Sequence, residues 1–221
     1  MPDGHVKRNY DVARRRERAD ARRREVVRSA WSLFTSLGYA RTTVTAVAAE
    51  AGVSPETIYK AFGGKAGLVR AVWQDALAGT GPDDAERRSD AMSATAGTGS
   101  DIIQGWVRLG LEVAPRAGLV LALVRAAADV DPEAARLLEE IEQGRAERML
   151  HNARVLGETG HVRPDLSIEQ ARDLLLLFTE EHHAWLVSRA GWSVDDYVAT
   201  MTRMMSAALL QVPDGERRPA S

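Results

Sequence analysis

Apolar residues recur along this chain at spacings of three and four, and this periodicity constrains the fold more than any other feature. Because an α-helix turns once every 3.6 residues, such spacing gathers apolar side chains on one helix face. Aromatic residues are sparse at 5%, whereas the helix formers Ala, Leu, Arg and Glu are abundant. The sequence therefore predicts an all-α fold of about nine helices.

Capping and breaking residues divide this pattern into segments. Gly38 is placed to end the first helix, and Ser54 followed by Pro55 is a strong signal for the start of another. Ser167 and Ser193 are each followed by an acidic residue within three positions, which is typical of a helix N-terminus. The predicted helices span residues 21–37, 43–51, 55–62, 65–77, 101–113, 115–128, 132–156, 167–189 and 193–212.

Charge is unevenly distributed along the chain. Residues 1–70 hold 14 Lys and Arg against 7 Asp and Glu (net +7), and residues 71–221 hold 15 against 24 (net −9), which together give −2. A basic first third suits a polyanionic partner, because attraction to phosphates supplies most sequence-independent affinity for DNA. The sequence lacks cysteine, an apolar run of membrane-spanning length and a signal-peptide pattern. We therefore expect a cytoplasmic protein without a membrane partner.

Two short predicted helices, 43–51 and 55–62, are joined through a three-residue turn at Gly52. Such a pair constitutes a helix-turn-helix, in which the first helix braces against the DNA backbone and the second enters the major groove. Apolar residues of this pair are expected to pack against the neighbouring helices. They are Val44, Val47, Ala48, Ala51, Val53, Ile58 and Phe62, and their expected partners are Val27, Phe34 and Val69.

Many residues at fixed spacing over about residues 22–72 resemble the DNA-binding domain of the TetR family of transcriptional regulators. The matching residues are Gly38-Tyr39, Thr42-Thr43-Val44, Val47-Ala48, Ala51-Gly52-Val53-Ser54, Thr57-Ile58-Tyr59-Lys60-Ala61-Phe62, Lys65 and Leu68. The resemblance implies a ligand-responsive repressor that binds an inverted-repeat operator in double-stranded DNA as a homodimer. The chain departs from the commonest family pattern at Ala61, where a histidine or aromatic residue is frequent, and this puts one phosphate contact in doubt.

Composition, helix signals and this resemblance together divide the chain into five segments. Residues 21–78 form the helix-turn-helix DNA-binding domain, 79–100 a loop or linker, and 101–212 a helical ligand-binding and dimerisation domain. Residues 1–20 are expected to be a basic flexible arm or a frayed helical extension, and residues 213–221 a disordered tail.

Carried over position by position, the resemblance implies a set of DNA contacts. Thr43, Tyr59 and Lys65 are expected to contact phosphates. Thr45 and the stretch Pro55-Glu56-Thr57 are expected to face base edges, Lys60 fits either role, and Ser54 completes the set. A hydroxyl at a helix start can donate to a phosphate, and a threonine offers a hydroxyl and a methyl to a thymine edge. The alternative is that these side chains only cap helices, pack, or carry a solvated charge.

The arginines at 14–16 and 22–24 are a separate feature. Runs of this kind are more often a solvated helix face than a groove reader. Insertion into the minor groove is the alternative.

The C-terminal half resembles the family only loosely, and its last two predicted helices look like the closing pair of actinobacterial-type TetR regulators. Both are apolar over a broad face, and paired across a two-fold axis they would build a four-helix dimer interface. The faces comprise Leu174, Leu175, Leu177, Phe178 and Trp185 on the first helix and Tyr197, Met201, Met204, Met205 and Leu209 on the second.

Polar and aromatic residues within apolar faces indicate a pocket for an unknown small-molecule effector, since ligand sites are mostly apolar with few polar groups. No cofactor is predicted. The alternative is that the aromatic members belong to the core. The candidate ligand-binding residues are Trp106, Arg125, Met149, Asn152, Phe178, His182 and Trp185.

Rival functions find weaker support. Glu180 and His183 have the Glu-x-x-His spacing of di-iron bundles, but His151 and His161 lack a matching Glu, so no metal site is predicted. The sequence has no phosphate-cradling glycine loop, no Gly-x-Ser-x-Gly elbow and no His-Glu-x-x-His helix, so we predict no enzyme. A helical adaptor that binds a partner without DNA is the alternative function.

Overall fold

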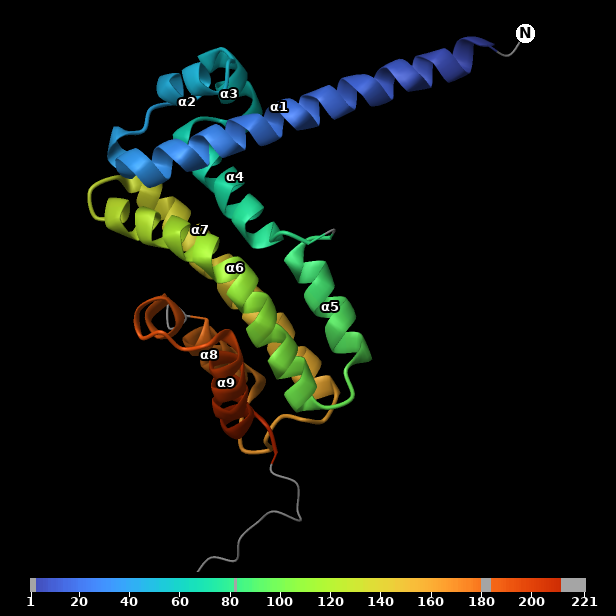
Figure 1. Ribbon diagram of the computed structural model, residues 1–221, viewed down its shortest axis with the longest axis vertical. Helices are drawn as coiled ribbons and strands as arrows, with labels where there is room; N and C mark the ends of the chain where they lie inside the picture. Colours follow the sequence, from blue (N-terminus) through green and yellow to red (C-terminus); the bar gives the residue numbers. More distant parts are fainter. Residues whose placement is uncertain (1–2, 82, 180–183, 212–221) are drawn as a thin grey trace, which may run out of the picture. The chain divides into compact units, whose positions relative to one another are not determined.

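The computed structural model describes residues 3–81, 83–179 and 184–211. Over these ranges the fold is all-helical, as predicted, and the β-pairing is confined to one isolated bridge between Val162 and Leu210 (Figure 1). Within the same ranges, no helix is both long and apolar enough to cross a membrane. The elements are α1 (Asp3–Arg41), α2 (Val44–Glu50), α3 (Pro55–Phe62), α4 (Lys65–Ala78), α5 (Ala85–Thr95), α6 (Gly99–Ala128), α7 (Pro132–Glu158), α8 (Ile168–Phe178), η1 (Ala184–Arg189) and α9 (Val194–Leu209).

The chain divides into two compact units. The first comprises Met1–Asp75 and Ala122–Leu137, and the second comprises Ala76–Leu121 and Leu138–Ser221. The first unit therefore includes a segment around the start of α7 that lies far from the helix-turn-helix in the sequence.

The core of the first unit lies between α1 and the helices α2 to α4. Predicted packing residues from α1, α2, α3 and α4 are buried, whereas Ala51, Val53 and Phe62 are only partly buried. Gly38 departs from helical geometry (φ 79°), which bends α1 near its end. The confirmed buried residues are Val27, Phe34, Val44, Val47, Ala48, Ile58 and Val69.

The N-terminal segment differs from the expected flexible arm. Residues 3–20 are helical and continue directly into the packed part of α1 (Figure 1). Arginine is the commonest residue of this segment, and it is a good helix former. Once the packed part of α1 has formed, extending the helix needs no new nucleus, so propensity alone favours its continuation.

The predicted loop over residues 79–100 is wrong, because α5 occupies its centre. The Asp84 side chain caps this helix by accepting a backbone hydrogen bond in its first turn. The buried face of α5 is built from small residues four positions apart, so no apolar stripe marks it in the sequence. These residues are Ala85, Ser89 and Ser93.

The predicted break at Pro115 is also wrong, because α6 is one helix with this proline inside it. A proline removes one backbone hydrogen bond, and here the ring is exposed, so water can satisfy the carbonyl that is freed. Residues before and after it, such as Val107 and Val120, are buried and keep the helix continuous.

The predicted helix over 167–189 is shorter than expected. α8 begins with a capping box between Ser167 and Gln170, as the sequence indicated, and ends at the C-cap Thr179. The later part, η1, is a short π-helical segment. Residues 180–183 and the predicted tail 213–221 lie outside the described residues.

The core of the second unit takes up most of the two faces that were predicted to build a dimer interface. Leu175 of α8 and four such residues of α9 are buried in one cluster with Ile102 and Ile103 of α6. Those faces therefore pack within the chain, which corrects the prediction for these positions. The four residues of α9 are Tyr197, Met201, Met205 and Leu209.

Candidate nucleic-acid interface

The recognition helix α3 is fixed at both ends by local signals. The Ser54 side chain accepts a hydrogen bond from the Thr57 N–H (3.3 Å), Pro55 occupies the first turn, and Gly63 ends the helix with a left-handed backbone (φ 80°). Ile58 is fully buried and orients the helix on the core. These constraints hold the opposite side of α3 away from the protein.

The outward edge of α3 carries the side chains that were predicted to read DNA. Glu56, Thr57, Tyr59 and Lys60 are exposed, with 58% of Tyr59 accessible, and Pro55 is half-buried. Hydrogen bonding to the Ser54 side chain lowers the pKa of Glu56, so this carboxylate stays ionised at neutral pH and can accept a hydrogen bond from a cytosine amino group.

The three predicted phosphate contacts lie around one hollow of about 330 Å³ in the first unit. Thr43 is the N-cap of α2, and its side chain accepts a hydrogen bond from the Ala46 N–H (3.1 Å). Tyr59 and Lys65 also line the hollow, together with Glu133 from the first turn of α7. The fold thus brings together a hydroxyl, a phenol and an ammonium group from three elements.

Lys65 is held in position by its neighbours. Its Nζ atom lies 4.0 Å from the centre of the Tyr39 ring and 3.5 Å from the carbonyl oxygen of Ala40. Burial lowers the pKa of Lys65, whereas the carboxylates of Asp131 and Glu133 act in the opposite direction. Because burial also raises the pKa of Tyr39 to about 12, that ring remains a neutral platform for the ammonium group.

Two further threonines have different surroundings. Thr45 is exposed on α2, as expected for a residue that faces DNA. Thr42 is buried, and its hydroxyl donates to the carbonyl oxygens of Gly38 (2.8 Å) and Leu33 (3.1 Å). Thr42 therefore stabilises the bend at the end of α1.

Comparison with known families decides the identity of this unit. Residues 26–72 match the sequence model of the family described as "Bacterial regulatory proteins, tetR family". This segment is a TetR-family DNA-binding domain. The protein is a DNA-binding transcriptional regulator and not an enzyme.

Solved structures extend the likeness over most of the chain. A transcriptional regulator from Saccharomonospora viridis, in complex with choline, has 19% identity and a TM-score of 0.62, over 88% of this chain and 100% of the other. The fatty acid degradation regulator FadR from Bacillus halodurans has 16% identity and a TM-score of 0.65, over 84% and 94%. NalD, the secondary repressor of the MexAB-OprM multidrug efflux pump in Pseudomonas aeruginosa, has 16% identity and a TM-score of 0.65, over 87% and 98%. At these identities the likeness shows that this chain shares their fold. No curated protein sequence matches it significantly.

Three of the candidate ligand-binding residues lie in or against the hydrophobic core of the second unit, and the other four are placed separately. Trp106 is buried in the core of the second unit, and its Nε1 atom donates to Ser93 Oγ (3.1 Å). Asn152 is also buried. The remaining five are placed as follows: Met149 and Phe178 pack against that core, Trp185 is 61% exposed, Arg125 belongs to the first unit, and His182 lies outside the described residues.

One buried polar group was missed by the sequence analysis. Thr202 on α9 is buried, and its hydroxyl has no hydrogen-bond partner among the described residues. An unsatisfied buried hydroxyl is costly unless a further group reaches it. A threonine in an amphipathic helix gives no sequence signal of this kind, because the same residue type is common on solvated faces.

The residues of the alternative metal site are not among those that the structure describes. Glu180 and His183, which carried the Glu-x-x-His spacing, lie outside the described residues. Elsewhere in the part of the chain that the structure describes, no group of three or more potential metal ligands occurs.

Proposed function

We propose that this regulator represses transcription by binding an inverted-repeat operator as a homodimer, and that a small molecule bound in the second unit releases it. The observation that carries the proposal is the exposed edge of α3 beside the hollow formed by Thr43, Tyr59 and Lys65. Base-reading groups and phosphate-binding groups are then available on one unit. A protein with this role acts on DNA in the cytoplasm.

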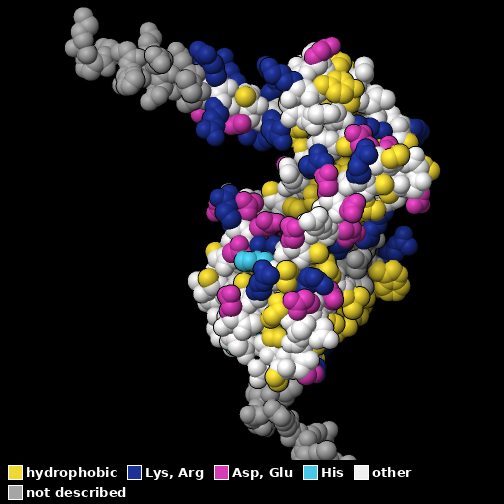
Figure 2. Space-filling view, turned by 180° about the vertical axis from the view of Figure 1, so that it is seen from behind, with side chains coloured by type: hydrophobic (Ala, Val, Ile, Leu, Met, Phe, Trp, Pro, Cys, Tyr) yellow, Lys and Arg dark blue, Asp and Glu magenta, His cyan; other side chains and the backbone are white. Residues whose placement is uncertain are grey.

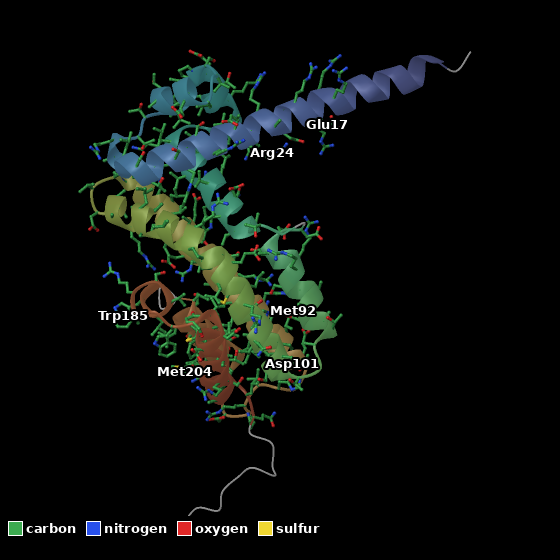
Figure 3. All side chains as sticks on the ribbon, in the orientation of Figure 1. Glu17, Arg24, Met92, Asp101, Trp185 and Met204 are labelled. Atoms are coloured by element: carbon green, nitrogen blue, oxygen red, sulfur yellow. The ribbon has the colours of Figure 1, made fainter. Side chains whose placement is uncertain are left out.

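Support for a dimer comes from apolar side chains on the second unit that remain accessible. Trp185, Met204 and Leu177 are 61%, 53% and 57% exposed, and Trp192 and Val194 are also exposed. Trp185 and Met204 project to the same side of the molecule in Figure 3. Accessible apolar groups of this size mark interaction surfaces, and a two-fold axis would bury them against their own copies.

Light scattering tests the dimer directly. We expect a mass of twice 24.1 kDa at micromolar concentration. Trp185→Ser combined with Met204→Ser should shift the protein towards monomer, whereas Val130→Ser, an 83% exposed position in the first unit, should leave the mass unchanged. A wild-type monomer would refute the dimer.

Support for an effector site comes from residues in and around the hydrophobic core of the second unit. The proposed ligand contacts remain Trp106, Met149, Asn152 and Phe178. His182 and Trp185, which the sequence also indicated, stay in the proposal. The structurally similar regulator from Saccharomonospora viridis binds choline, so relatives of this fold accept small molecules.

Selection of bound duplexes from a random DNA pool tests the proposed function. We expect an inverted repeat whose half-sites are about one helical turn apart or somewhat wider. Binding of the selected duplex should weaken steeply between low and high salt, because phosphate contacts release counterions. Absence of binding at low salt would instead favour the adaptor role. Equal operator affinity with and without a confirmed effector would refute the release step.

A further inference from the structure

The N-terminal part of α1 presents a dense positive charge that the helix-turn-helix does not use. Residues 14–28 contain eight arginines and three acidic residues, and every side chain from 14 to 24 is exposed. Figure 2 shows dark blue side chains along this extension and close to the packed part of the first unit. A solvated helix needs no such excess of one sign, since like charges on neighbouring turns destabilise it.

Helical geometry sorts these arginines onto two sides. At 100° per residue, four of them fall on the side that also carries the buried Val26, Val27 and Ala30 further along α1. Of the acidic residues, Glu17 and Glu25 lie on the opposite side, and Asp20 lies about 70–80° from the centre of this side. We name these four arginines the basic stripe, and they are Arg15, Arg16, Arg22 and Arg23.

A contact joins the basic stripe to the recognition helix. The Arg23 guanidinium carbon lies 4.6 Å from the centre of the ring of Phe62, the last residue of α3. A guanidinium stacked on a ring keeps its edge donors available for an anion. The stripe therefore begins beside the end of α3 and runs from there along α1 towards the N-terminus.

The helical form decides which part of the duplex the stripe can reach. An α-helix with its side chains is about 10–12 Å across, whereas the minor groove of B-DNA is about 6 Å wide. The extension therefore does not enter the minor groove as an extended arm would. Its arginines can still reach phosphate oxygens along the groove edge, where bidentate guanidinium contacts are favourable.

We propose that the basic stripe binds the phosphate backbone of the DNA that flanks each operator half-site. The twelve residues 14–25 span about 18 Å as a helix, which corresponds to about five base pairs. The contact would be independent of sequence, and it would lengthen the bound region beyond the bases read by α3. The inference rests on the proposed function and names a second DNA contact for it.

The experiment compares two duplexes that carry the sequence selected from the random pool. The core duplex contains the selected sequence alone. The flanked duplex has five base pairs of unrelated sequence added at each end. The stripe variant changes Arg15, Arg16, Arg22 and Arg23 to alanine, which keeps the helix because alanine is the best helix former. A control variant removes the same charge from the other side of α1, at Arg14, Arg18, Arg24 and Arg28. Circular dichroism checks helix content in both.

For the wild type we expect the flanks to raise affinity at least tenfold at about 0.1 M salt, and the control variant should retain most of this gain. The stripe variant should gain little, and the slope of log affinity against log salt should fall in magnitude by about 2 to 4, or about 0.9 per lost phosphate contact. A stripe variant that keeps the full gain, or a control that loses as much, would overturn the proposal. If the stripe variant still binds the core duplex, the proposed operator function stands whatever the flanks do. If the wild type itself does not bind the core duplex, the proposed operator function is refuted.

Discussion

Replacement of Glu112 by glutamine should destabilise the protein at neutral pH by an amount that disappears on acidification. This carboxylate of α6 accepts hydrogen bonds from the Thr80 N–H (2.6 Å) and from both terminal nitrogens of Arg88 (2.7 and 2.9 Å). It thereby ties α5 and the connection before it to α6 within the second unit. The hydrogen bonds from Arg88, followed by that from the Thr80 N–H, lower the pKa of Glu112 from 4.5 to about 2.

The size of the effect follows from this pKa. Each unit of difference between the folded and unfolded pKa corresponds to about 1.4 kcal/mol, so the full linkage would be roughly 3 kcal/mol. The side chains of Arg88 and Glu112 are 26% and 24% exposed, and solvent weakens the interaction of surface pairs. We therefore expect Glu112→Gln to lower the free energy of unfolding by about 1–2 kcal/mol at pH 7.

The sign of the pH dependence follows from the direction in which folding shifts the pKa of Glu112. Because the folded pKa lies below the unfolded value, the stabilisation is complete above about pH 4.5 and is lost as the pH falls towards 2. Urea unfolding, followed by circular dichroism at pH 7, 4 and 2.5, measures the gap between wild type and variant. Glu139→Gln, at an exposed position on α7, is the control. The reasoning fails if the gap at pH 7 is absent, or if it is as large at pH 2.5 as at pH 7.

Three other substitutions test separate parts of the structure. Gly67→Ala should prevent folding of the first unit and remove DNA binding, because its Cβ would collide with the carbonyl oxygen at the end of α3; Gly110→Ala, with open space around it, should keep both thermal stability and DNA binding. Lys65→Ala should weaken binding to all duplexes similarly, whereas Thr57→Ala should change base preference in a repeat of the pool selection; an altered preference in the lysine variant would contradict this assignment. Trp106→Phe should cost about 1 kcal/mol in urea unfolding through loss of its hydrogen bond to α5, and an unchanged midpoint would show that this bond contributes nothing.

The elements that sequence reasoning located are those with local signals. Ser54, Ser167 and Ser193 are helix N-caps in the structure, since capping depends on residues only two or three positions away. The outward edge of α3 was predictable for the same reason. By contrast, Pro115 was misread because tertiary packing on both sides of it overrides its local effect. α5 was missed because its buried face consists of alanine and serine.

The candidate effector site was less predictable because an apolar helix face does not identify its partner. Tyr197 and Met201 were assigned to a contact between two copies, yet they pack within the second unit of the same chain. Trp106 was chosen as a ligand contact, and its indole nitrogen is already engaged by Ser93. Such pairings depend on side chains far apart in the sequence, and periodicity carries no information about them.

The attachment of α3 has a consequence for how operator preference can change. Ile58 is the fully buried side chain of this helix, and the ends are fixed by Ser54 and Gly63. Substitutions at Glu56, Thr57 or the other outward positions therefore leave the hydrophobic core untouched. A lineage of such proteins can acquire new target sequences through single mutations without passing through unstable intermediates, and an engineer can randomise the same positions while folding is preserved.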